Sequence, residues 1–144
     1  MESNRVSQSP ATTRCVIILN AGLSAGKAAN AAAVLAVTVG QRHPDLVGTS
    51  LSDAAGCEFP GLVSVGISVL SASAASLCRM AAQAAPNLVD CVVFPRDGQS
   101  TTDYLQLRNI VALGHFETME MSGIALIGDK KLLRGMTKEL SLWG

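Results

Sequence analysis

The sequence predicts a single α/β domain, and three observations indicate it. Apolar runs alternate along the chain with segments of helical pattern, which is typical of α/β proteins. The length of 144 residues suits one domain, and 49% hydrophobic residues can fill one core. Only 3% of the residues are aromatic, so aliphatic side chains must form that core and allow close packing of helices on a sheet. We expect three layers, α/β/α, around a mixed, mostly parallel sheet of about four strands.

The first strand and the first helix come early in the chain. Residues 15–20 form an apolar run that reads as a buried central strand. Ser24 is a suitable N-cap for the alanine-rich helix that follows, which we expect to end near Gly40. Residues 45–60 are a polar excursion with the pattern of a hairpin, and residues 53–56 are its expected turn.

The next two elements are a second strand and a second helix. Apolar and small residues alternate over 63–69, which is the period of a strand with one buried face. Ser71 or Ser73 then begins a helix that Pro86 ends.

The second half of the chain repeats this alternation. Residues 88–94 predict a third strand, and residues 95–98 a turn. Residues 100–103 resemble a capping box, with an aspartate in its third position, before a helix that ends at Gly114.

The last elements are a central strand, a short helix and an edge strand. Residues 123–128 are apolar throughout, as in a central fourth strand. Asp129 begins the helix, and residues 140–143 predict the edge strand. The domain then spans 14–144, after a flexible tail at 1–13 that lacks the apolar core of a signal peptide.

The composition excludes several classes of function. Eleven basic residues balance eleven acidic ones and the pI is about 6.7, so the chain has no general attraction for nucleic acid. The uncharged run 59–78 contains a proline, two glycines and five serines, too polar for a membrane span. The four cysteines are far apart with no Cys-x-x-Cys pair, which indicates buried, reduced thiols of a cytoplasmic protein and no zinc site.

Lys27 is the most informative single residue. It follows Gly26 in the first turn of the first predicted helix, where unpaired backbone N–H groups and the helix dipole repel a cation mildly and attract an anion. The order of strand, turn, glycine and lysine suggests a phosphate-binding loop. The match fails because Ala21 replaces the first glycine and Ala28 replaces the magnesium-binding hydroxyl.

Several short motifs together resemble one family. They are Leu23-Ser-Ala-Gly26, the alanine run 28–35, His43-Pro44-x-Leu46-Val-Gly48, Pro60-Gly-Leu62, Gln99-Ser100 with Tyr104, and Gly123-Ile-Ala-Leu126. Over residues 15–143 this set resembles the family named domain of unknown function 2000. The resemblance implies a three-layer α/β/α fold similar to that of type 2 peptidyl-tRNA hydrolases, and no established activity.

A more distant likeness to those hydrolases implies candidate catalytic residues. Lys27 precedes Ala-Ala-Asn30, which is similar to their lysine before Ala-Ala-Gln. Asp97 and Thr101 keep the spacing of their Asp-Ala-Gly-x-Thr motif, although the central glycine has moved. Residues 135–142 resemble their C-terminal pattern, with Gly135 in place of a lysine. These departures and the absent positive charge argue against a transfer-RNA substrate.

Hydrolysis of an ester or amide is a reaction that Lys27, Asp97 and Thr101 could catalyse together. Asp97 would orient or deprotonate a water, Lys27 would stabilise the oxyanion, and Thr101 would donate a hydrogen bond. No metal or cofactor is required. We expect the site at the carboxyl ends of the strands, between the loops 22–30 and 96–101. The ligand-binding residues expected there are Gly26, Asn30, Gln99 and Ser100.

Each of these residues also has a purely structural interpretation. Asp97 suits an Asp-Gly turn, Thr101 suits a helix cap, and Lys27 suits a solvated surface. The second hypothesis is therefore a non-catalytic module that binds a small anion or metabolite.

Three basic residues near the C-terminus share a regular spacing. Lys130, Arg134 and Lys138 recur every four residues, and we interpret them as a solvated helix face. The expected assembly is a homodimer, because two-fold assemblies are the commonest among soluble oligomers.

Overall fold

The computed structural model describes residues 12–144, which form a mixed α/β fold as predicted. The strands are β1 (Thr13–Asn20), β2 (Leu51–Ser52), β3 (Glu58–Phe59), β4 (Ile67–Ala72), β5 (Asp90–Pro95), β6 (Met121–Asp129) and β7 (Ser141–Leu142). The helices are α2 (Ala25–Arg42), α3 (Ala74–Ala84), α4 (Tyr104–Ala112) and α5 (Lys130–Thr137). A 3-10 turn, η4 (Arg96–Gln99), follows β5.

The main sheet has five strands in the order β5-β6-β1-β4-β7, so the prediction of about four strands was too low. The prediction of a mostly parallel sheet was wrong, because within residues 12–144 only the β1–β4 pair of this sheet is parallel and the other three pairs are antiparallel. The reason lies between β5 and β6. The connecting helix α4 buries none of its residues and does not cross a face of the sheet, so the chain re-enters beside β5 in the opposite direction.

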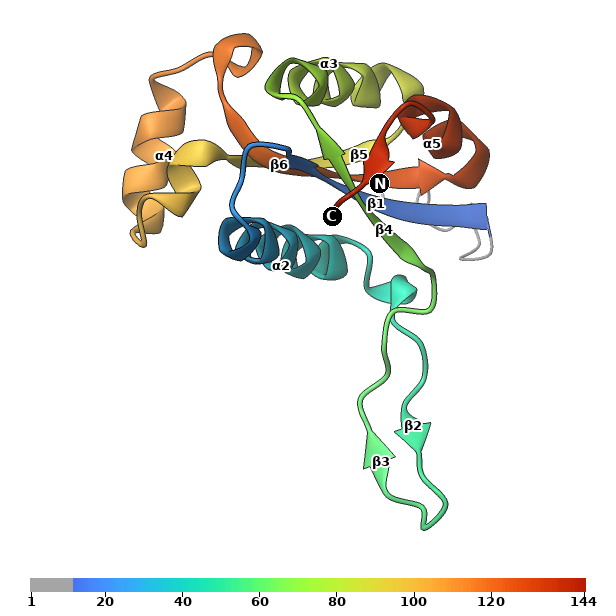
Figure 1. Ribbon diagram of the computed structural model, residues 1–144. Helices are drawn as coiled ribbons and strands as arrows, with labels where there is room; N and C mark the ends of the chain where they lie inside the picture. Colours follow the sequence, from blue (N-terminus) through green and yellow to red (C-terminus); the bar gives the residue numbers. More distant parts are fainter. Residues whose placement is uncertain (1–11) are drawn as a thin grey trace.

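Helices cover both faces of the sheet (Figure 1). On one face, Ile18 of β1 belongs to the same core cluster as Leu77 of α3 and Leu133 of α5. On the other face, Ile17 clusters with Leu35 of α2. Alternate side chains of β1 therefore serve two cores, as the period of a strand requires.

Several element boundaries differ from the predictions. Helix α2 begins after Ser24, whose hydroxyl accepts from the Lys27 N–H at 3.3 Å as predicted, but it continues to Arg42 and beyond Gly40. Strand β4 begins at Ile67 because residues 63–66 belong to a hairpin arm. The N-cap of α4 is Asp103, whose carboxylate accepts from two backbone N–H groups of the first turn.

Residues 47–66 form an arm that projects away from the domain (Figure 1). The predicted hairpin is confirmed, because β2 and β3 pair antiparallel around a turn at residues 53–56. Gly56 has a positive φ of 87°, which favours glycine, and its N–H donates to the carbonyl of Asp53. Gly61 is needed because a Cβ there would overlap the carbonyl oxygen of Gly48 on the facing segment of the arm.

The C-terminal predictions are largely confirmed. Strand β7 pairs with β4 at the edge of the sheet. Helix α5 ends at Thr137, so Lys138 lies at its C-cap and does not extend the helical row of Lys130 and Arg134.

The four cysteines differ in exposure. All four cysteines are unpaired; Cys15 is buried, but Cys57 is exposed at the end of the arm, contrary to the expectation of buried thiols. Thr13, expected in the tail, opens β1, and residues 1–11 lie outside the described part of the chain. Across 12–144, the helices are too short or too polar to cross a bilayer.

Candidate functional site

Gln99 joins the two loops in which the sequence placed the site. Its side-chain N–H groups donate to the carbonyl oxygen of Lys27 at 2.8 Å and to Oδ1 of Asn30 at 3.2 Å. Its own amide oxygen accepts from the hydroxyl of Ser122 at 2.8 Å, and Ser122 is fully buried in β6. The first turns of α2 and the loop after β5 therefore lie side by side, fixed to the sheet through one amide.

Lys27 and Asp97 are both exposed and do not form an ion pair. Among residues 12–144 the ion pairs join Asp90 to Arg42 and His43, and Arg96 to Glu120. Asp97 lines a hollow of about 370 Å³ beside the C-terminal end of α4, and Lys27 is not part of it. The geometry does not place the amine against the carboxylate.

Thr101 is engaged with α4. Its hydroxyl donates to Oε1 of Gln106 at 2.6 Å and accepts from the N–H of Asp103 at 3.1 Å. Ser100 is exposed and donates to the carbonyl of Asp97 at 2.9 Å, which closes the η4 turn. A Cβ on Gly26 would meet open space, so no close backbone contact requires glycine there.

A groove of about 660 Å³ lies between α2, β5 and α4. Its walls are mainly aliphatic and aromatic. The lining includes Asn30, Val34 and Thr38 of α2, Phe94 of β5, and Leu107 and Arg108 of α4. Because Asn30 and Thr38 are eight residues apart on one helix face, the groove extends about 12 Å at a rise of 1.5 Å per residue.

Polar side chains line the groove beside Gln99. Asn30, Thr101 and Thr102 gather at the end next to Gln99 and offer amide and hydroxyl groups. Gly98 lies so close to the ring of Phe94 that a Cβ there would overlap the ring. The sequence motifs indicated Asn30 and Thr101 but did not predict the groove. The residues 30, 34 and 38, spaced four apart on the outer face of α2, were the available signal.

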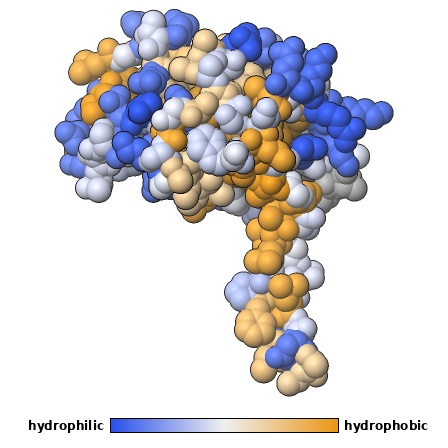
Figure 2. Space-filling model, in the orientation of Figure 1, coloured by the Kyte–Doolittle hydropathy of each residue, from blue (hydrophilic) through white to orange (hydrophobic). Residues whose placement is uncertain are grey.

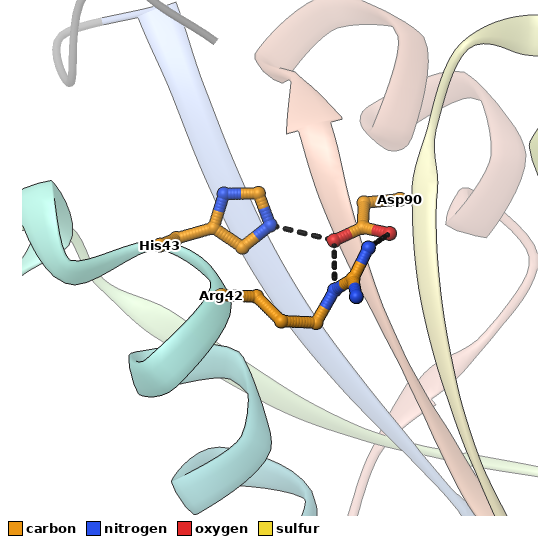
Figure 3. Close-up of polar contacts among 3 residues, drawn as sticks. All are labelled: Arg42, His43 and Asp90. Carbon is orange, nitrogen blue, oxygen red and sulfur yellow. Dashed lines mark hydrogen bonds and ion pairs between the residues drawn. The ribbon is translucent and has the colours of Figure 1, made fainter. Parts of the chain in front are cut away.

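A carboxylate clamp closes the far end of α2 (Figure 3). Arg42 donates two hydrogen bonds of 2.8 Å to the two oxygens of Asp90, and Nε2 of His43 lies 2.7 Å from one of them. Partial burial tends to raise the pKa of Asp90, but the bonds from Arg42 and His43 outweigh it and leave that pKa below its ordinary value. The clamp holds α2 against β5, and hence fixes two walls of the groove.

Two of the four cysteines, Cys15 and Cys91, lie in strands of the sheet. Burial raises the pKa of Cys15 and of Cys91 to about 11, so both are poor nucleophiles near neutral pH. No three side chains of His, Cys, Asp or Glu within residues 12–144 gather closely enough to hold a metal ion.

Comparisons with known proteins place the chain among proteins of unknown function. Residues 13–144 match the model of a family described as "Protein of unknown function (DUF2000)". A solved structure of the protein of unknown function Atu0240 from Agrobacterium tumefaciens strain C58 is 20% identical. The match covers 92% of this chain and 98% of the other, with a TM-score of 0.84, and shows a common fold. No curated protein matches the sequence significantly.

Proposed function

The chain belongs to the DUF2000 family of proteins of unknown function, and for this member we propose a role in binding a small, mainly apolar metabolite in the groove between α2, β5 and α4. The groove itself is the observation that carries the proposal. Its volume of about 660 Å³ lies within the range of about 300 to 1,000 Å³ that small-molecule sites occupy.

The distribution of polarity in the groove suggests the shape of the ligand. An apolar body about 12 Å long would lie against Val34, Phe94 and Leu107, and a polar group would meet Asn30 and Thr101. A few polar groups in an otherwise apolar pocket are the usual arrangement for orienting a ligand.

Helix α4 supports the same interpretation. None of its residues is fully buried, and Tyr104, Leu107 and Val111 recur along its groove face at spacings of three and four. A helix with an apolar stripe ordinarily buries it. A ligand in the groove would cover this stripe and stabilise the contact of α4 with the domain.

The test is a screen of metabolites by thermal unfolding, followed by calorimetric titration of the wild type and two matched variants. Val34→Asp puts a charge into the groove. Val37→Asp puts the same charge on the same helix at a position that is 74% exposed and outside the groove. We expect Val34→Asp to abolish binding and Val37→Asp to retain it. Equal effects of the two variants would contradict the assignment.

A second candidate is hydrolysis of an ester or amide by Lys27, Asp97 and Thr101, as the likeness to type 2 peptidyl-tRNA hydrolases implies. The observation in its favour is the Gln99 bridge, which joins the turn carrying Lys27 to the loop carrying Asp97. Thr101 stands at the polar end of the groove, where a substrate carbonyl would be accessible.

Assays on aminoacyl and peptidyl esters separate the two candidates. Turnover by the wild type that is lost in both Lys27→Ala and Asp97→Asn supports the hydrolase. Binding without turnover supports the metabolite-binding role alone, and turnover unchanged in both variants would exclude these residues as catalytic.

A further inference from the structure

We propose that the arm, residues 47–66, packs one apolar face against the same face of a second copy of this chain. The arm is an interaction surface separate from the groove, and this inference does not rest on the proposed function.

The register of the hairpin puts its apolar side chains on a single face. Val47 pairs with Val63, and Leu51 pairs with Phe59. Four residues separate the two pairs on each strand, and an even separation keeps side chains on the same side of a hairpin. Leu62 is separated from Phe59 and Val63 by an odd number of residues, so its side chain lies on the opposite face.

This face has no cover within the described chain. Val47, Leu51, Phe59 and Val63 are 48, 50, 54 and 40% exposed although all four are large and apolar. An apolar strip runs along the arm in the space-filling view (Figure 2). An isolated two-stranded hairpin is marginally stable in water, so an arm that projects from its own domain needs a partner surface. Apolar patches of this kind mark protein interaction sites.

Charge identifies the partner as a second copy. The arm carries Asp53 and Glu58 and no lysine or arginine. The hollow at its base, about 430 Å³, is lined by Arg14 and Lys130 and, among residues 12–144, by no acidic residue.

The guanidinium of Arg14 gives the wall of the hollow positive charge and, within residues 12–144, has one unpaired N–H. The Nε of Arg14 is buried and has no hydrogen-bond partner among the described residues, while its Nη2 donates to Ser68 at 2.7 Å.

Two-fold symmetry brings these features together. When two identical arms stack antiparallel, the end of each arm lies at the base of the other. Val47 and Val63 of one copy then cover Leu51 and Phe59 of the other, and the acidic end meets the basic hollow. The surface is self-complementary in both apolar contact and charge.

Sedimentation equilibrium of the full chain with three arm variants tests the proposal. Leu51→Asp and Phe59→Asp charge the apolar face, and Leu62→Asp is the matched control because Leu62 is 69% exposed on the opposite face. All three positions are exposed, so the domain should remain folded, which circular dichroism verifies. We expect a wild-type dimer at about 100 µM, and a rise in Kd of about 30-fold or more for each face variant. Leu62→Asp should remain dimeric.

Three results would overturn the proposal. They are a wild-type monomer throughout this concentration range, a dimer that survives both face variants, and equal disruption by Leu62→Asp.

A charge experiment tests the antiparallel arrangement. Asp53→Asn removes the charge but keeps the side-chain oxygen that accepts from the N–H groups of Ala55 and Cys57 in the turn. We expect Asp53→Asn and Lys130→Gln each to weaken the dimer by about 3-fold, and the double variant to weaken it by little more than either single change. A Kd unchanged in both single variants would contradict this arrangement of the arms.

Discussion

The side-chain amide of Gln99 donates a hydrogen bond of 2.8 Å to the main-chain carbonyl oxygen of Lys27, across 72 positions of sequence. The same side chain accepts from buried Ser122. One residue thus fixes the loop after β5 to the first turn of α2 and to a strand of the sheet. The polar end of the groove depends on this connection, because Asn30 and Thr101 are carried by the two segments that Gln99 joins.

Replacing Gln99 should therefore lower stability. Gln99→Ala removes two donated bonds and leaves the buried hydroxyl of Ser122 without its acceptor, which costs about 2 to 3 kcal/mol of unfolding free energy. Urea denaturation measures the difference. Gln83→Ala, an exposed position on α3, is the control and should change stability by less than about 0.5 kcal/mol. A similar cost for the two variants would show that the bridge contributes nothing specific.

The Asp90 clamp should make stability depend on pH. A carboxyl whose pKa is lower in the folded than in the unfolded protein stabilises the fold above its unfolded pKa of about 3.8, and the contribution is lost as the pH falls through the folded value. At pH 7 we expect Asp90→Asn to cost about 1 kcal/mol, a modest value because the Arg42 side chain is 44% exposed.

The clamp prediction is checked by urea denaturation of wild type and Asp90→Asn from pH 7 to pH 3. The difference between the two proteins should be largest near neutrality and shrink below about pH 4. Asp45→Asn, at an exposed aspartate with no partner in the described chain, should show no such difference. A gap between wild type and Asp90→Asn that persists at low pH would contradict the electrostatic account.

Gly98 should tolerate no side chain. A Cβ would overlap the ring of Phe94, so Gly98→Ala must displace a wall of the groove, at a cost of about 1 to 3 kcal/mol. Gly26→Ala is the matched control. It meets open space in the first turn of α2 and should be neutral or slightly stabilising. Thermal unfolding of both variants measures the effect, and equal melting temperatures would contradict the close packing at Gly98.

The thiols should differ in reactivity. Iodoacetamide at pH 8 is expected to modify exposed Cys57 first, whereas Cys15 and Cys91, with a pKa of about 11, are thiolate in about one molecule in a thousand. Mass spectrometry of peptides over time distinguishes the sites, and unfolding in urea should expose all four. Early modification of Cys15 would show that the core around β1 opens readily.

The local pattern of the sequence predicted most elements of the fold. The apolar run before Asn20, the cap at Ser24 and the hairpin turn at 53–56 are local features with local causes, and the structure contains each of them. Strand direction is not local. The antiparallel pairing of β5 with β6 follows from where α4 lies, and α4 buries none of its residues against the sheet.

The same contrast between local and non-local features applies to the candidate site. The sequence correctly indicated that the loops 22–30 and 96–101 meet, and Gln99 is the residue that joins them. It could not reveal that Thr101 turns toward Gln106 or that Asp97 lines a separate hollow, because such orientations depend on a few ångströms of loop geometry. The groove was missed because its walls come from three elements separated in sequence.

The most direct test of the account is chemical-shift mapping of the ¹⁵N-labelled protein with a metabolite that stabilises it in the thermal screen. The groove assignment predicts amide shifts confined to residues 30–38, 92–98 and 101–112, which should disappear in Val34→Asp and persist in Val37→Asp. Shifts centred elsewhere, or unchanged by Val34→Asp, would contradict the proposal that this groove is the binding site.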